Sequence, residues 1–197
     1  MNALFAWFLR RRGRRQDLCA YFQDVSAALA LTECAFQKYP VPAVSGKYFG
    51  FRLSLEGRSN RKNKTHPYKI KGVVHLPQKI EERIYLHHES RPASFKPIAT
   101  LQLVHTHVEH FDRQFLLLAS NEHWVHAIFQ PYLCQRFLSL QDPPWILDLQ
   151  QEEAHLEFQL KTLDSAALSK SLQVVVECLN TVLATVFNKE SLKNSVS

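Results

Sequence analysis

Histidine is the residue type best suited to chemistry in this sequence, which contains ten of them. Three candidate metal ligands, His105, His107 and Glu109, alternate in the segment VHTHVEH. If a β-strand runs through this segment, the three side chains point to one face. Two imidazoles and a carboxylate are ligands that zinc and manganese accept, and His87 or His88 on a neighbouring strand would add another. Because a bound metal lowers the pKa of its water, a metal-dependent hydrolase is one functional hypothesis.

The same segment also fits an interpretation without chemistry. If residues 105–110 form the end of a strand or a loop, their imidazoles are exposed to solvent and need no metal. The sequence contains no Walker loop, no G-x-G-x-x-G and no G-x-S-x-G, and no nucleophile motif surrounds its serines or cysteines. The sequence therefore favours a non-enzymatic protein and predicts no cofactor.

The charges of the chain are unevenly distributed. Residues 1–71 contain 14 Lys and Arg against 4 Asp and Glu, a difference of +10, whereas residues 72–197 contain 10 against 14, a difference of −4. A basic front half favours an anionic partner, since clustered charge attracts oppositely charged surfaces. The simpler alternative is that these side chains only solubilise loops.

The first sixteen residues, MNALFAWFLRRRGRRQ, combine aromatic side chains with five arginines. In a signal peptide the charges precede the apolar run, and a membrane-spanning helix needs about 20 apolar residues, so neither is predicted here or later in the chain. An apolar run beside arginines suits the surface of an anionic membrane. The alternative is a helix that packs on its own domain and exposes its arginines.

The predicted partner-binding residues are aromatic and basic side chains of the N-terminal segment and of the polar loop 57–67. They are Trp7, Phe8, Arg10, Arg11, Arg12, Arg14, Arg15, Arg58, Arg61, Lys62 and Lys64. The predicted partner is an unknown protein or an anionic lipid surface. Nucleic acid fits less well, because the aromatic residues precede the arginines instead of alternating with them, although single-stranded nucleic acid stays an alternative for the basic front half.

Length and composition predict one folded domain. A chain of 197 residues is long enough to fold around one core without a metal or a disulfide. We expect a basic extension over 1–15, a domain over 16–188 and a polar tail over 189–197. The four cysteines are far apart in the sequence and predict reduced, mostly buried thiols. Reduced thiols favour the cytoplasm, either free or at the periphery of the membrane.

Hydrophobic periodicity predicts the elements of this domain. Helices are expected over 16–31, over about 122–140 with a break at Pro131 and a cap at Asn121, and from Ser165 onward. Strands are expected over 51–56, 68–76 with a bulge at Gly72, 83–89, 100–106, 113–120, 145–150 and 154–160, the last two as a hairpin. The predicted fold is α+β, with a mostly antiparallel sheet of six or seven strands and the helices mainly on one face.

Several motifs resemble those of a group of uncharacterised bacterial domains, over about residues 16–187. They are a G-x-Y-x-G strand, an F-D-x-x-F strand and a helix broken by proline, at Gly46, Tyr48, Gly50, Phe111, Asp112, Phe115 and Pro131. The resemblance implies a bacterial intracellular or membrane-associated domain and transfers no catalytic residue. We expect Phe111 and Phe115 to anchor the core, and Asp112 to cap a turn or to pair with Arg113 or Arg136.

Overall fold

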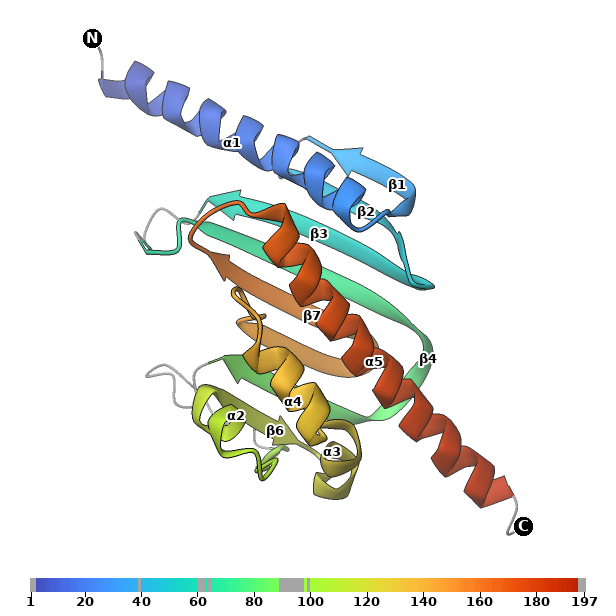
Figure 1. The fold of residues 1–197 in the computed structure, drawn as a ribbon. Coiled ribbons are helices and arrows are strands. Elements are labelled where there is room, and N and C mark those ends of the chain that lie inside the picture. Colours follow the sequence, from blue (N-terminus) through green and yellow to red (C-terminus); the bar gives the residue numbers. More distant parts are fainter. Residues whose placement is uncertain are drawn as a thin grey trace.

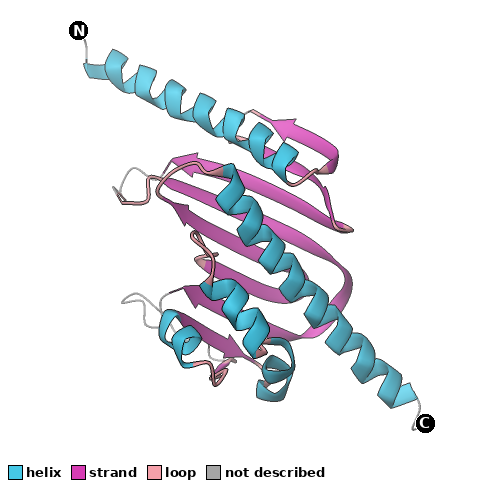
Figure 2. Ribbon diagram, viewed as in Figure 1, coloured by secondary structure: helices cyan, strands magenta, loops and turns pink. Residues whose placement is uncertain are grey.

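The computed structural model describes the backbone of residues 3–38, 40–59, 63, 65–88, 98 and 100–194. Side chains are described within these ranges from residue 16 to residue 187. The chain forms a seven-stranded antiparallel sheet with the long helices on one face (Figures 1 and 2). This architecture confirms the predicted α+β fold.

The elements follow one another as α1 (Ala3–Ala28), β1 (Thr32–Gln37), β2 (Ala43–Tyr48), β3 (Phe51–Ser59), β4 (Tyr68–His88), β5 (Gln102–Leu103), α2 (Glu109–Gln114), β6 (Phe115–Ala119), α3 (Glu122–Ile128), α4 (Pro131–Leu138), β7 (Ile146–Leu160) and α5 (Ser165–Asn194). Across the sheet the strands have the order β1-β2-β3-β4-β6-β5, and β7 pairs with β4. Each of these pairs is antiparallel.

Strands β4 and β7 are much longer than the others, because both double back within the sheet. In Figure 1, β4 curves round at the right of the view and returns, and β7 lies inside that curve. The ladder between them begins with Tyr68 opposite Leu160, ends with His87 opposite Ile146, and shifts register at the curve. Gln151 of β7 has a φ of 52° near this point. The other edge of β4 pairs with β3 along the first arm and with β6 along the second.

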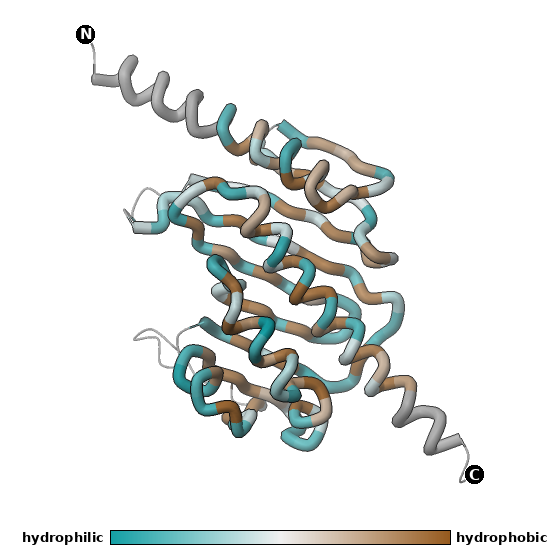
Figure 3. The backbone as a smooth tube through the Cα atoms, in the orientation of Figure 1, coloured by the Kyte–Doolittle hydropathy of each residue, from teal (hydrophilic) through white to brown (hydrophobic). Residues whose placement is uncertain are grey.

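One face of the sheet is apolar because every second side chain of a strand points toward the helices. On β3, for example, Phe51, Leu53 and Leu55 are buried, whereas Arg52 is exposed and Ser54 is half-buried. Figure 3 shows the resulting alternation of hydrophobic and hydrophilic residues along the strands. Helix α5 crosses this face (Figure 1). Its spacing predicts a buried stripe at Leu168, Leu172, Val175, Leu179, Val182 and Val186, of which the first five are buried and Val186 is half-buried.

Helix α5 also has the composition of a membrane span. Over Ser165–Phe187 it is the one helix in the described part of the chain that is long and apolar enough to cross a membrane. Half of that window is buried inside the fold. Packing of the apolar stripe on the sheet therefore gives a structural reason for this composition.

Phenylalanines form the core beneath α2, α3 and α4. Phe111 stacks on Phe115 with ring centroids 4.6 Å apart, and Phe129 and Phe137 complete the cluster. All four side chains are buried. The structure thus confirms that Phe111 and Phe115 of the F-D-x-x-F motif anchor the core.

Asp112 of the same motif caps the turn that precedes α2. Its carboxylate accepts hydrogen bonds from the backbone N–H of Thr106 at 3.0 Å and from the Thr106 hydroxyl at 2.9 Å. Arg113 instead donates to Glu109, and Arg136 pairs with Glu177. Of the alternatives that the sequence left open for Asp112, the turn cap is therefore the correct one.

The predicted break between the central helices is also confirmed. Asn121 Oδ1 accepts a hydrogen bond from the Trp124 N–H at 3.3 Å and begins α3. Pro131 is the first residue of α4, a position where the missing N–H of proline costs nothing. Between β2 and β3, Phe49 and Gly50 have φ angles of 46° and 85°, and Tyr48 stands opposite Phe51, so the two strands are joined by a two-residue hairpin turn.

Five strand predictions are wrong in detail. Periodicity does not predict β1, because all six of its residues are exposed and buried side chains do not alternate with exposed ones along it. Segments 68–76 and 83–89 are the two arms of β4, and 145–150 and 154–160 are arms of β7. The strand expected over 100–106 is only Gln102–Leu103. Gly72 is not a bulge, since the register continues through it on both edges of β4.

We expect Gly57→Ala to loosen α1 from the sheet. A Cβ atom at Gly57 would lie 2.9 Å from Leu18 Cδ2, 3.0 Å from Phe22 Cζ and 3.1 Å from Ile70 Cδ1. Overpacking of this kind lowers the free energy of unfolding by about 1–3 kcal/mol, which urea denaturation measures. Ser54→Ala, on the uncovered face of the same strand, is the control and should change it by less than about 0.5 kcal/mol. Equal stability of Gly57→Ala and the parent would contradict this packing.

The four free cysteines should differ in reactivity. Cys134 and Cys178 are buried, Cys19 is half-buried and Cys34 is exposed on β1, so the prediction of mostly buried thiols is correct for two of the four. Burial raises the pKa of the Cys134 thiol to about 11 and that of Cys178 to about 12. Because the thiolate is the reactive form, we expect iodoacetamide at about pH 8 to modify Cys34 rapidly and to spare the two buried thiols. Peptide mass spectrometry measures this, and equal alkylation of all four thiols in the folded protein would overturn it.

Candidate functional site

Helix α1 has two halves with different surroundings. In its C-terminal half, Leu18, Tyr21, Phe22 and Val25 are buried, and the helix packs on α5, β2 and β3. Its N-terminal half continues as the same helix beyond the sheet (Figure 1). The boundary expected between residues 15 and 16 therefore falls inside one continuous helix.

The N-terminal half of α1 carries most of the predicted partner-binding residues. Trp7, Phe8 and the arginines at 10, 11, 12, 14 and 15 occupy helical backbone positions within Ala3–Ala28, while their side chains lie outside the described residues. Leucine, alanine and arginine favour helix, and only Gly13 opposes it, by about 1 kcal/mol. The sequence therefore supports a helix that holds these residues within about two and a half turns.

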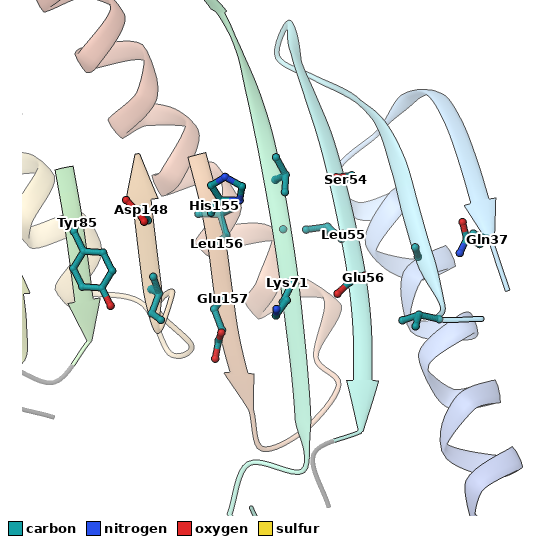
Figure 4. Close-up of a pocket in the computed structure, with 15 residues that line it drawn as sticks. Gln37, Ser54, Leu55, Glu56, Lys71, Tyr85, Asp148, His155, Leu156 and Glu157 are labelled. Atoms are coloured by element: carbon teal, nitrogen blue, oxygen red, sulfur yellow. The ribbon is translucent and has the colours of Figure 1, made fainter. Parts of the chain in front are cut away.

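The other predicted basic residues belong to the connection between β3 and β4, of which only part is described. Arg58 is exposed near the end of β3 and pairs loosely with Glu56, at 3.6 Å. Arg61, Lys62 and Lys64 lie outside the described residues. In Figures 1 and 4, β3 ends and β4 begins at the end of the sheet toward which α1 extends. The described ends of β3 and β4 that flank this loop therefore lie on the side from which α1 extends.

The strand-face arrangement predicted for His105, His107 and Glu109 is not formed. The strand β5 ends before them, His107 has a φ of 65°, and Glu109 begins α2. All three side chains are exposed. His105 Nδ1 lies 3.9 Å from Asp112 Oδ2, and the ring of His107 stacks on that of His126.

The other histidines considered as ligands have structural surroundings. His87 and His88 lie at the end of β4, and their rings contact that of Trp145, with centroids 5.3 and 5.9 Å away. Across the residues that the structure describes, no group of three or more His, Cys, Asp or Glu is arranged to hold a metal.

The face of the sheet that the helices leave uncovered carries an open groove of about 510 Å³. Its wall residues come from the five strands β1, β2, β3, β4 and β7 and from the connection after β1. Figure 4 labels Gln37, Ser54, Leu55, Glu56, Lys71, Tyr85, Asp148, His155, Leu156 and Glu157. Its charged lining residues are the carboxylates Glu56, Asp148 and Glu157 and one lysine, Lys71. Carboxylates therefore outnumber basic side chains in the wall of the groove.

Charged side chains in the middle of the groove follow the strand register. Lys71 stands directly opposite Glu56 on one neighbouring strand and Glu157 on the other. Glu157 also forms an ion pair with Lys69, with 2.5 Å between Lys69 Nζ and Glu157 Oε1. Opposite charges at directly paired positions stabilise a sheet by a few tenths of a kcal/mol each, up to about 1. This row therefore has a structural role beside any role in binding.

Tyr85 and Asp148 lie side by side in the wall of the groove (Figure 4). Asp148 forms a bidentate ion pair with Arg83. The Arg83 Nε and Nη2 groups donate to the two carboxylate oxygens at 2.9 and 2.6 Å. Burial, with the negative charge of Asp148 as the next cause, raises the pKa of the neighbouring Tyr85. Tyr85 is therefore a neutral hydrogen-bond donor at physiological pH.

Sequence reasoning missed this groove for a clear reason. Alternation on β3 and along 154–160 marks Glu56 and Glu157 as outward-facing, but nothing in the sequence shows that Lys71 lies between them. That adjacency depends on β4 lying between β3 and β7, segments about 100 residues apart. The sequence offered the alternation of polar and apolar residues along each strand, but this signal does not give the order of the strands in the sheet.

Comparison with known proteins shows a likeness of fold. No protein-family model and no curated protein matches the sequence. The structure is similar to the crystal structure of the mycobacterial trehalose monomycolate transport factor A, TtfA, with a TM-score of 0.56 and 11% sequence identity. The match covers 89% of this chain and 94% of that chain. At this identity the similarity shows a shared fold with a bacterial protein.

The Arg83–Asp148 pair should stabilise the fold measurably. Its hydrogen bonds are charge-assisted and bidentate, and both side chains are less than one third exposed. We expect Asp148→Ala and Arg83→Ala each to lower the free energy of unfolding by about 1–3 kcal/mol, with a coupling energy of about 1 kcal/mol in the double-mutant cycle. Lys47→Ala and Glu33→Ala, which break a more exposed pair, form the control cycle and should couple more weakly. Additive effects at Arg83 and Asp148 would show that the pair contributes nothing.

Proposed function

We propose that this chain is a non-enzymatic bacterial binding domain that the N-terminal half of α1 holds at the anionic inner surface of the membrane. The observation that carries the proposal is the continuity of α1. One helix includes both the residues that anchor it in the core and the segment with Trp7, Phe8 and five arginines that extends past the sheet (Figure 1).

Physical reasons favour a lipid surface as the partner. Aromatic residues insert at the interface between headgroups and acyl chains, and arginines pair with anionic headgroups. At about 1 kcal/mol for each basic residue near such a surface, five arginines contribute about 5 kcal/mol at low salt. Arg58, which is exposed near the end of β3 on the side toward which α1 extends, would add further attraction.

A binding role also fits the rest of the fold better than catalysis does. Two carboxylates that line the groove, Glu157 and Asp148, are held in ion pairs with Lys69 and Arg83. The fold is similar to that of a protein described as a transport factor, which supports a binding role for this chain.

Vesicle flotation tests the proposal. We expect the protein to float with vesicles of phosphatidylcholine containing about 30% phosphatidylglycerol, and to stay unbound with pure phosphatidylcholine. Binding should weaken as the salt concentration rises from about 0.1 to 0.5 M, because salt screens exposed charges. Replacement of Arg10, Arg11, Arg12, Arg14 and Arg15 by Gln should abolish flotation.

The control variant carries the same change of net charge at other exposed positions. Replacement of Arg52, Lys71, Lys79, Lys161 and Lys170 by Gln also removes five positive charges and should leave flotation intact. Equal binding to neutral and anionic vesicles, or an equal loss in both variants, would overturn the proposal. Circular dichroism of each variant confirms that it is folded.

A further inference from the structure

The groove on the uncovered face of the sheet follows one row of paired residues. In the register of the strands, Gln37 stands opposite Ala43, Ala43 opposite Glu56, Glu56 opposite Lys71, and Lys71 opposite Glu157. All five line the groove, and Figure 4 shows the labelled ones following one another across the strands. Four strand spacings of about 4.8 Å make this row about 19 Å long. The groove is therefore elongated and suits an extended chain better than a compact ligand.

Two carboxylates in the wall of the groove are compensated by basic side chains outside it. Asp148 forms the bidentate pair with Arg83, and Glu157 forms the ion pair with Lys69. Neither of these basic residues lines the groove. A positive charge on a ligand would meet Arg83 or Lys69 beside each carboxylate, and like charges placed close together oppose binding. The groove therefore disfavours a cationic ligand, although carboxylates outnumber basic residues in its wall.

The lysine of the wall lies between two carboxylates. Lys71 has Glu56 opposite it on one neighbouring strand and Glu157 on the other. Among the described residues, its ammonium group forms no hydrogen bond or ion pair, so it is available as a donor. A negatively charged ligand would reach this group only beside two negative charges. The groove therefore disfavours an anionic ligand as well.

The polar groups of the wall include both donors and acceptors. Carboxylate oxygens accept hydrogen bonds and the Lys71 ammonium group donates them, whereas the Ser54 and Tyr85 hydroxyls can do either. A hydroxyl group on a ligand also donates and accepts, so it can pair with each of these groups. A peptide N–H, in contrast, only donates, and a peptide C=O only accepts. Hydrogen bonds to charged side chains are stronger than those between neutral groups, so an uncharged ligand rich in hydroxyls fits this wall.

Apolar side chains lie among these polar groups. Val73 stands directly between Ser54 and His155 in the register, and Ile146 lines the groove near Asp148. A sugar ring has the matching pattern, because its hydroxyls surround faces that carry only C–H groups. The volume of about 510 Å³ also lies in the range of about 300–1,000 Å³ that is typical of small-ligand sites.

We propose that this groove binds an uncharged, polyhydroxylated chain, a neutral oligosaccharide of a few units that crosses the strands from β1 toward β7. Its hydroxyl groups pair with Glu56, Lys71 and Glu157, and its C–H faces contact Val73 and Ile146. The site lies on the face of the sheet opposite the helices, and the proposal does not depend on membrane binding by α1.

Isothermal titration calorimetry without vesicles tests the proposal with probes of similar length and different charge. The neutral probes are maltopentaose, cellopentaose and penta-N-acetylchitopentaose, the cationic probe is the fully deacetylated chitosan pentamer, and the anionic probe is pentagalacturonate. We expect at least one neutral probe to bind with a Kd below about 1 mM, and both charged probes to bind at least about tenfold more weakly. Raising the salt concentration from about 0.1 to 0.5 M should change the Kd of the neutral probe by less than about twofold, because salt screens only charges.

Variants locate the binding site. Lys71→Met removes the charged donor in the middle of the row and should weaken binding of the neutral probe about tenfold or more. Tyr85→Phe removes a single hydroxyl and should weaken it about threefold. Lys79→Met is the matched control, since it makes the same change at an exposed residue of β4 outside the groove, and should leave binding unchanged. Urea denaturation confirms that each variant is folded.

Three results would overturn the proposal. They are the absence of binding by every neutral probe, binding of a charged probe as tight as that of the best neutral one, and equal binding to Lys71→Met and Lys79→Met. Replacement of the five arginines of α1 by Gln should leave binding of the neutral probe unchanged, so this result is independent of vesicle flotation.

Discussion

The long ladder between β4 and β7 is the interaction on which the rest of this structure depends. These two strands contain 21 and 15 residues, and their doubled arms form the middle of the sheet (Figure 1). The first arm of β4 carries β3, and through it β2 and β1, while the second arm carries β6 and β5. Without this ladder the chain would be two small sheets with no common core.

The doubled ladder also determines what the helices can cover. It provides a continuous apolar face wide enough for α5, and α5 in turn supports α1, α3 and α4. The opposite face receives the alternate residues of the same strands, which include the charged side chains of the groove as well as Val73 and Ile146. The groove and the core are therefore two consequences of one register, and a shift by one residue would exchange them.

Much of this architecture could be predicted from the sequence, because its strongest signals are periodic. The stripe of α5, the cap at Asn121 and the break at Pro131 depend on neighbouring residues, and all three are confirmed. The curve of β4 could not be predicted, since alternation between His75 and Ile84 looks the same whether the strand is straight or bent. Nor could the groove, whose residues meet only through strand order. The histidine prediction depended on a strand that ends before His105.

The single helix α1 has a mechanical consequence. A flexible linker between an anchoring segment and a domain lets the domain tumble, whereas an uninterrupted helix transmits orientation. The contacts of Leu18 and Phe22 above Gly57 fix the angle between this helix and the strands. A partner that binds the N-terminal end of α1 therefore also sets the orientation of the uncovered face of the sheet.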